Sequence, residues 1–103
     1  MAEYAIYNVK EEKWRDMAFR SYDALMDEFG EINRSDYECV YAFESGKELS
    51  LDDIYYIFNM ARPKDFMAHS LSVSDVVETP EGFFFCDSFG WQKLDWEWWN
   101  GGI

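Results

Sequence analysis

Apolar residues in the segment 22–29 recur at positions i, i+3, i+4 and i+7, which is the spacing of one face of an α-helix. Ser21 precedes this segment, and serine is a favoured N-cap because its hydroxyl accepts a backbone N–H of the first turn. Gly30 follows it, at the place where a residue with left-handed backbone geometry commonly ends a helix. The pattern therefore predicts a helix over 22–29.

The segment 51–58 has the same spacing and predicts a second helix. Ser50 and Asp53 match a variant of the capping box, with aspartate in place of the usual glutamate. Pro63 cannot continue a helix, and it disfavours helical geometry at the residue before it. We therefore expect the second helix to end near Ala61.

Five segments have the composition or the alternation of β-strands. Residues 37–43 place Tyr, Cys, Tyr and Phe at alternate positions on one face, and residues 4–9 are rich in aromatic and β-branched side chains. Residues 73–79 and 83–87 flank a Pro-Glu-Gly turn and predict a hairpin, and residues 89–94 predict a last edge strand. The Phe-Phe-Phe run that opens the fourth segment is typical of a central strand covered on both faces.

The element order β-α-β-α-β-β indicates a small α+β domain, in which two helices pack on one face of a mostly antiparallel sheet. A chain of 103 residues fits one domain. We expect residues 1–94 to form this domain, with a charged loop over 11–16, and residues 95–103 to form a tryptophan-rich acidic tail. The predicted single core contains Leu25, Met26, Phe29, Val40, Tyr41, Leu51, Ile54, Tyr55, Phe58, Val76 and Phe84.

Charge is the first indication of function. The chain has 21 acids and nine Lys and Arg residues, a net charge of −12, which argues against binding to nucleic acid or to an anionic membrane and favours a basic partner. Residues 35–103 contain thirteen acids and four bases, a net charge of −9. Twelve charges correspond to about 20 Å of DNA duplex, so the protein could occupy a groove built for DNA or RNA. The alternative is that the acidity only provides solubility.

Neither a membrane span nor a disulfide framework is predicted. No apolar run approaches the roughly 20 residues that a spanning helix needs, and the first residues contain no apolar segment of a secretion signal. Cys39 and Cys86 lack the CxxC spacing, so we expect both to be reduced core residues. These features predict a cytoplasmic protein.

The segment 69–75, with the sequence HSLSVSD, has the residue types of a hydrolase but not the arrangement. A catalytic triad brings its members together from different elements beside an oxyanion hole, and proximity along the chain supplies neither. We expect Ser72, Ser74 and Asp75 to bond to the backbone at the start of a strand, and His69 not to act as a base. Two scattered cysteines and one histidine cannot form a closed zinc site. We therefore predict no catalytic residue, no cofactor and no metal.

Tryptophans are concentrated at the C-terminal end, where four of the five lie within the last thirteen residues. Trp98 and Trp99 are adjacent, so they cannot both face one core in either a helix or a strand. Two interpretations remain open: the segment covers an open end of the small core, or it presents tryptophans to a partner.

The strings LDDIYYIFN from Leu51, HSLSVSDVV from His69 and CDSFG from Cys86 resemble the YodL-like domain. With the strands at 4–9 and 37–43, the resemblance covers about residues 4–94. The YodL-like domain is a small domain of plasmids, conjugative elements and phages of Firmicutes. The resemblance therefore implies a protein of a mobile genetic element that acts in a bacterial host cell.

This setting and the charge together lead to the first functional hypothesis, an anti-CRISPR protein that inhibits a type II system. It would bind the host RNA-guided nuclease, whose nucleic-acid channel is strongly basic, and compete there with guide RNA or DNA. The step from fold to function is an analogy. The expected partner-binding residues are Asp52, Asp53, Glu78, Glu81, Asp95, Trp96, Glu97, Trp98 and Trp99.

Two other classes of function remain open. The first is a non-catalytic adaptor of a plasmid or phage, which binds a replication or transfer protein. The second is a nuclease that acts on guide RNA, which would need a local basic platform on this acidic chain. That platform would require clustering of Arg15, Arg20, Arg34, Arg62 and Lys64.

Overall fold

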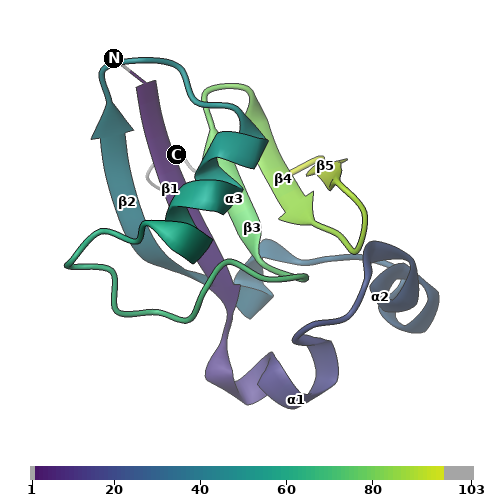
Figure 1. Ribbon diagram of the computed structural model, residues 1–103. Helices are drawn as coiled ribbons and strands as arrows, with labels where there is room; N and C mark the ends of the chain where they lie inside the picture. Colours follow the sequence, from purple (N-terminus) through teal and green to yellow (C-terminus); the bar gives the residue numbers. More distant parts are fainter. Residues whose placement is uncertain (1, 97–103) are drawn as a thin grey trace, which may run out of the picture.

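A five-stranded antiparallel sheet lies at the centre of the structure, a computed structural model that describes residues 2–96 (Figure 1). The strands are β1 (Ala2–Val9), β2 (Tyr37–Ser45), β3 (Val76–Thr79), β4 (Gly82–Cys86) and β5 (Trp91–Leu94). Their order across the sheet is β2-β1-β3-β4-β5. β4 has a partner on each side, as its phenylalanines predicted, and the α+β class with an antiparallel sheet is confirmed.

Short helices connect the strands. A 3-10 turn at Glu11–Lys13 leads into α1 (Trp14–Met17), so the segment predicted as a charged loop is largely helical. α2 spans Tyr22–Phe29, a second 3-10 turn covers Arg34–Asp36, and α3 spans Leu51–Met60. No helix within residues 2–96 is long and apolar enough to cross a membrane.

Both predicted helices have the caps that the sequence indicated. Ser21 Oγ accepts the N–H of Ala24 at 3.2 Å, and Gly30 ends α2 with a φ of 77°. Ser50 Oγ accepts the N–H of Asp53 at 3.0 Å, and the Asp53 carboxylate accepts the N–H of Ser50 at 3.0 Å. The capping box is confirmed, and its bonds satisfy N–H groups that have no partner inside the helix.

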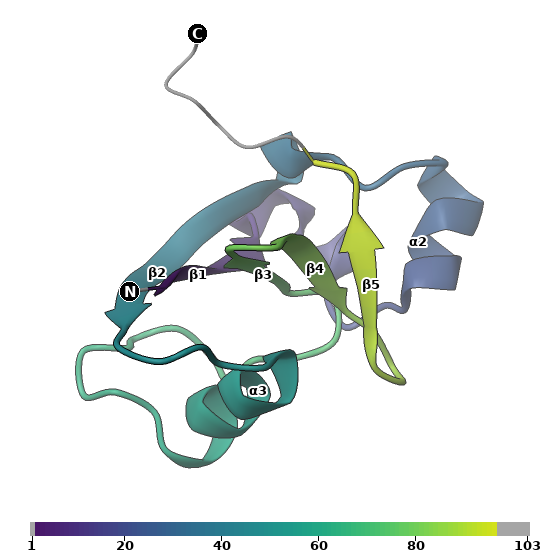
Figure 2. The ribbon, with the colours of Figure 1, turned by 90° about the horizontal axis from the view of Figure 1, so that it is seen from above.

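The helices cover opposite faces of the sheet, which corrects the expectation that they share one face. In Figure 2, α3 lies on one side of the sheet, and α2 lies beside β5, away from α3. Ile54 and Phe58 of α3 belong to one buried cluster, and Met17 of α1 and Leu25 of α2 belong to another. The α3-side core contains Tyr4, Ile6, Ile54, Phe58, Phe66, Leu71 and Val77. The α2-side core contains Ala5, Tyr7, Val9, Met17, Leu25, Ile32, Tyr37, Val76, Phe83, Phe85 and Leu94.

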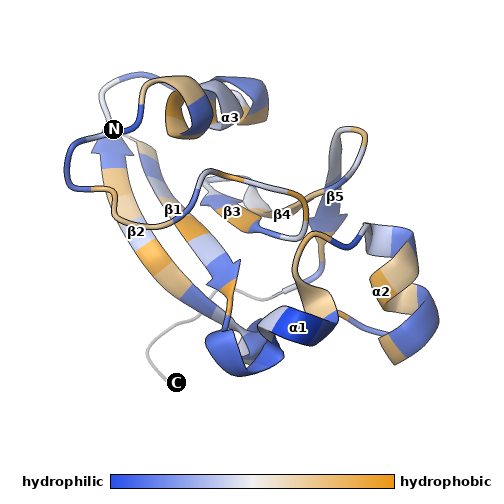
Figure 3. Ribbon diagram, turned by 60° about the horizontal axis from the view of Figure 1, so that its bottom comes forward, coloured by the Kyte–Doolittle hydropathy of each residue, from blue (hydrophilic) through white to orange (hydrophobic). Residues whose placement is uncertain are grey.

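Apolar residues on both faces of the central strands explain this two-sided packing. Val76 and Val77 are consecutive in β3, so they point to opposite faces, and both are fully buried. A sheet with an apolar residue on each face has to be covered on each face. Figure 3 shows hydrophobic bands along β1 and β2, whereas most of α1 is hydrophilic.

A β-bulge explains why the alternation in 37–43 does not place its residues on one face. Tyr7 pairs with Cys39 and Ile6 pairs with Tyr41, so Val40 is an extra residue in β2. The bulge reverses the alternation beyond it, and Tyr37 packs in the α2-side core while Tyr41 packs against the α3-side core. Cys86 is buried as predicted, but the prediction of a core position is wrong for Cys39, which is exposed on β2.

The predicted core residues differ in how far they are buried. Leu25, Ile54, Phe58 and Val76 are fully buried, but they divide between the two cores. Phe29 and Tyr55 are each 45% exposed. The remaining predicted core residues are partly buried: Met26, Val40, Tyr41, Leu51 and Phe84.

Phe58→Ala should destabilise the protein by about 3–5 kcal/mol, because it removes a fully buried ring and leaves a cavity. The Phe58 ring contacts the rings of Tyr41, Phe43 and Phe66, with centroids 4.8–5.7 Å apart. Urea denaturation measures the change, and Phe89→Ala is the control, since Phe89 is 95% exposed and should shift stability by less than about 0.5 kcal/mol. Equal stability of the two variants would refute this core.

Candidate functional site

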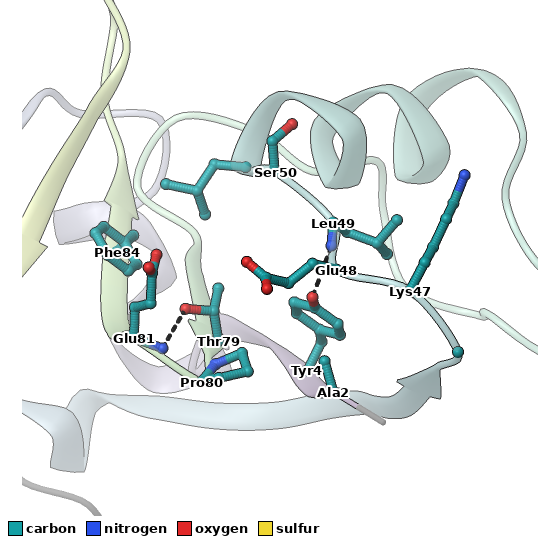
Figure 4. Close-up of a pocket in the computed structure, with 12 residues that line it drawn as sticks. Ala2, Tyr4, Lys47, Glu48, Leu49, Ser50, Thr79, Pro80, Glu81 and Phe84 are labelled. Atoms are coloured by element: carbon teal, nitrogen blue, oxygen red, sulfur yellow. Dashed lines mark hydrogen bonds between the residues drawn. The ribbon is translucent and has the colours of Figure 1, made fainter.

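The topology brings two connections to one end of the sheet. β2 and β3 both run antiparallel to β1, so they run in the same direction and end at the same side. The loop that leads from β2 to α3 therefore faces the turn between β3 and β4. Between them lies an open hollow of about 630 Å³ (Figure 4). Its lining comes from residues 46–51 and 79–81, with Ala2, Tyr4 and Phe84.

Hydrogen bonds to buried side chains hold both walls of this hollow. The hydroxyl of Tyr4 accepts the N–H of Leu49 at 2.8 Å, and the Tyr4 ring stacks on Phe43 with centroids 5.3 Å apart. On the opposite wall, Thr79 Oγ1 accepts the N–H of Glu81 at 3.0 Å. Tyr4 and Thr79 are both buried, so each wall is fixed from inside the fold.

Acidic side chains lie in and beside the hollow. Glu48 and Glu81 extend their carboxylates into it from opposite walls (Figure 4). Asp52 and Asp53 are exposed on the first turn of α3, directly after the lining residue Leu51. The hydrogen bond from the Ser50 N–H lowers the pKa of the Asp53 carboxyl. The fold thus gathers three of the predicted acids and adds Glu48, which the sequence analysis missed.

Two other predicted acids lie elsewhere. Glu78 is half-buried, and its carboxylate accepts the hydroxyl proton of Tyr7 at 2.7 Å on the α2 side of the sheet. Burial and this bond raise the pKa of Tyr7. Asp95 is exposed beside a separate hollow that Tyr22 and Met26 of α2 also line. The remaining predicted residues Glu97, Trp98 and Trp99 lie outside the described part of the chain.

Trp96 packs on the α2-side core. Its ring lies 5.2 Å from that of Tyr37 and 5.4 Å from that of Phe83, centroid to centroid. The indole N–H donates to the carbonyl of Ile32 at 2.8 Å. These contacts extend the packed domain at least to residue 96, two residues beyond the expected boundary, and they give Trp96 a structural role.

Ser72, Ser74 and Asp75 bond to backbone groups, as predicted. Ser72 Oγ donates to the carbonyl of Ser70 at 2.8 Å, and Asp75 Oδ2 accepts the N–H of Ser72 at 2.8 Å. Ser74 Oγ accepts the N–H of Phe19 at 3.0 Å. All three polar groups therefore hold backbone at the entry to β3.

His69 also bonds to this segment. Its Nδ1 lies 2.6 Å from the carbonyl oxygen of Ser70 and 3.7 Å from Asp75 Oδ2. A carbonyl oxygen only accepts, so Nδ1 carries the proton. Nε2 is buried and has no hydrogen-bond partner among the described residues. The ring packs against Trp14 and Phe19, at 5.2 and 6.2 Å between centroids.

Among the acids of residues 2–96, Asp75 is the one that the fold removes from water, with 1% exposure. Burial raises the pKa of its carboxyl to about 7, and the Ser72 N–H, His69 and Asn8 oppose this shift. The same carboxylate contributes to the raised pKa of the buried Cys86 thiol, about 12, for which burial is the main cause. A thiol with this pKa is not a nucleophile at neutral pH.

The basic residues considered for RNA binding divide between the two faces of the sheet. Arg34 lies over the rings of Tyr7 and Phe83 on the α2 side, whereas Arg62 and Lys64 follow α3 on the other side. Arg20 pairs with Glu28 at 2.9 Å. Among residues 2–96, no three His, Cys, Asp or Glu side chains lie close enough together to share a metal ion.

Trp96→Ala should lower stability by about 2 kcal/mol, because it removes a half-buried ring and leaves the Ile32 carbonyl without its donor. Urea denaturation measures the change. Trp14→Ala serves as the control, since Trp14 is an exposed tryptophan and should cost less. An unchanged unfolding midpoint for Trp96→Ala would leave Trp96 with no structural role.

Asp75→Asn should remove a pH dependence of stability. The folded pKa, about 7, exceeds the ordinary value of 3.8, so the native chain binds more protons than the unfolded chain between these pH values. Stability from this group is therefore lost as pH rises through 7, by about 2–3 kcal/mol between pH 5 and pH 8. Urea denaturation at both pH values should show this loss in the wild type and in the exposed control Asp27→Asn, but not in Asp75→Asn. Equal losses in all three proteins would contradict the assignment.

Comparison with known protein families identifies a match over most of the chain. A model of the YodL-like domain matches residues 3–96, which is most of the chain. Searches of curated proteins and of solved structures found no match. The matched residues are almost the same as the residues that the structure describes, and they include Trp96. The chain therefore belongs to the YodL-like domain family.

Proposed function

We propose that this protein is an anti-CRISPR inhibitor of a type II system. It binds the RNA-guided nuclease of its bacterial host and competes with guide RNA or DNA for a basic surface, without catalysing a reaction. The partner-binding face is the end of the sheet that carries Glu48, Asp52, Asp53 and Glu81.

The observation that carries this proposal is an acidic surface with little internal neutralisation. All acids in the described part of the chain are exposed except Asp36, Asp75, Glu78 and Asp87. Among residues 2–96, Glu28 is the one carboxylate that lies within 4 Å of a lysine or arginine nitrogen. Exposed charge without a counter-charge extends its field into solvent, where it attracts a basic surface.

The dimensions of the molecule support competition with nucleic acid. The principal extents are 39, 35 and 24 Å, and the net charge of −12 equals that of about 20 Å of duplex. A nuclease channel built for a duplex could therefore meet a similar charge over a similar length. The mobile-element setting that the YodL-like resemblance implies supports the same partner, because such elements face host defence nucleases.

The bonding of the candidate catalytic side chains supports a role without catalysis. The hydroxyls of Ser72 and Ser74 bond to backbone groups and not to His69, and Cys86 is a buried thiol. A nuclease acting on guide RNA would need a basic platform, whereas Arg34 and Arg62 lie on different sides of the sheet.

The variant Glu48→Gln/Asp52→Asn/Glu81→Gln tests the proposed face. It leaves Asp53 in place, because the Asp53 carboxylate caps α3. Association with the guide-free host type II nuclease should slow about tenfold at low salt and become less sensitive to salt, because the removed charges steer the encounter. Biolayer interferometry at several salt concentrations measures both effects, and added guide RNA should displace the wild-type protein.

The matched control Asp23→Asn/Asp27→Asn/Glu31→Gln removes three exposed acids in and just after α2 and should associate much faster than the first variant. Equal slowing by both variants would reduce the effect to net charge and refute the proposed face. Failure of the wild type to bind the nuclease, with capture of a plasmid or phage protein instead, would favour the adaptor function.

A further inference from the structure

We propose that the hollow between the β2–α3 loop and the β3–β4 turn receives an arginine side chain of the partner protein. The inference rests on the proposed function and names the group by which the partner is held. It is drawn from the walls of the hollow, their charge and their rigidity.

The charge of the hollow favours a cation. Glu48 and Glu81 face each other across it, and Asp52 and Asp53 stand on the adjoining turn of α3 (Figure 4). The neighbouring cations are Lys47, in the loop, and Lys93, on β5. Two carboxylates therefore line the hollow and two more lie on the adjoining turn, with two ammonium groups nearby.

The start of α3 does not reverse this preference. A helix N-terminus attracts anions through its free N–H groups, but here Ser50 Oγ accepts the N–H of Asp53. The carboxylates of Asp52 and Asp53 already occupy the first turn, where they interact favourably with the helix dipole. An incoming anion would meet these charges first.

The walls also suit the apolar stem of a long side chain. Leu49, Leu51, Pro80 and Phe84 line the hollow beside the two glutamates. The Lys93 ammonium lies 5.9 Å from the centroid of the Phe84 ring, so this ring already has a cation beside it. A volume of about 630 Å³ is within the usual range of ligand pockets, roughly 300–1,000 Å³.

Arginine fits this combination better than lysine. Its planar guanidinium can donate to two carboxylates at once and stack on an aromatic ring, whereas the lysine ammonium is a compact and strongly hydrated charge. The bonds Leu49–Tyr4 and Glu81–Thr79 hold both walls before any partner arrives, which lowers the entropic cost of binding.

NMR titration of the ¹⁵N-labelled full chain tests the ligand class without any nuclease. The probe is N-acetyl-arginine N-methylamide, and the control is its citrulline analogue, which has the same shape and no charge. Arginine should shift the amide signals of Glu48, Leu49 and Glu81 with millimolar affinity, and citrulline should not. Equal shifts with citrulline, no shifts, or shifts spread equally over α2 would overturn the proposal.

Two variants, each with a control, test separately whether arginine binding needs the charge of the hollow and whether it needs the open space. Glu48→Gln/Glu81→Gln should weaken arginine binding about tenfold, because charge-assisted hydrogen bonds are lost. Its control is Glu3→Gln/Glu44→Gln, which removes a pair of exposed acids that face each other across β1 and β2. Ala2→Phe should fill the hollow and abolish binding at unchanged net charge, whereas Ala42→Phe, beside a different hollow, should leave it unchanged.

The same variants distinguish failure of this inference from failure of the proposed function. If the wild type binds the nuclease and a folded Ala2→Phe binds it equally well, the arginine site is refuted and the inhibitor remains. If the wild type does not bind the nuclease, the inhibitor is refuted, and the arginine titration still decides what the hollow binds. Spectra of the free variants establish that each is folded.

Discussion

The sheet must be covered on both faces, and the rest of the structure depends on this constraint. β3 and β4 bury apolar side chains on both faces, Val77 on the α3 side and Val76, Phe83 and Phe85 on the α2 side, and 103 residues leave little chain to cover them. α3 covers one face, and α1 and α2 cover the other. Because the helices are short, irregular segments complete both cores: Phe66 and Leu71 on the α3 side, and Ile32 and Trp96 on the α2 side. The long connection from α3 to β3 is therefore part of the core.

The end of this connection is buried where it leads into β3, so its polar backbone groups need hydrogen-bond partners. This need explains the polar residues of the HSLSVSD segment, residues 69–75. The carbonyl of Ser74 accepts the hydroxyl proton of Tyr37 at 2.7 Å, and its hydroxyl accepts the N–H of Phe19. Ser74 and Phe19 both have positive φ angles, 86° and 64°, which cost about 1–3 kcal/mol each in residues other than glycine. The bond between them joins the end of α1 to the start of β3 and offsets part of that strain. Serines, histidine and aspartate thus occur together here because a buried chain entry needs several hydrogen bonds.

Features that depend on neighbours within a few residues could be predicted from the sequence, and features that depend on strand order could not. The caps at Ser50 and Gly30 and the strand at 83–87 rest on local patterns. Alternation shows which residues share a face but not which helix covers it, and the bulge at Val40 changes the face without a clear signal in the sequence. The meeting of Glu48 with Glu81 requires β2 and β3 to run in the same direction on either side of β1. The role of Trp96 requires a carbonyl 64 residues earlier in the chain.

Two sets of acids in this chain differ in what their carboxylates do. Asp53, Asp75 and Asp87 accept backbone N–H groups, and Glu78 accepts the Tyr7 hydroxyl, so these four hold the fold together. Glu48, Asp52 and Glu81 are exposed at the end of the sheet where the walls are held from inside by Tyr4 and Thr79. The carboxylates of the first group are satisfied within the chain, and under the proposed function those at the hollow bind a partner. An acidic surface used only for solubility would not need a partly apolar hollow between its carboxylates with both walls held from inside, and this combination is why the proposed function places the binding face here.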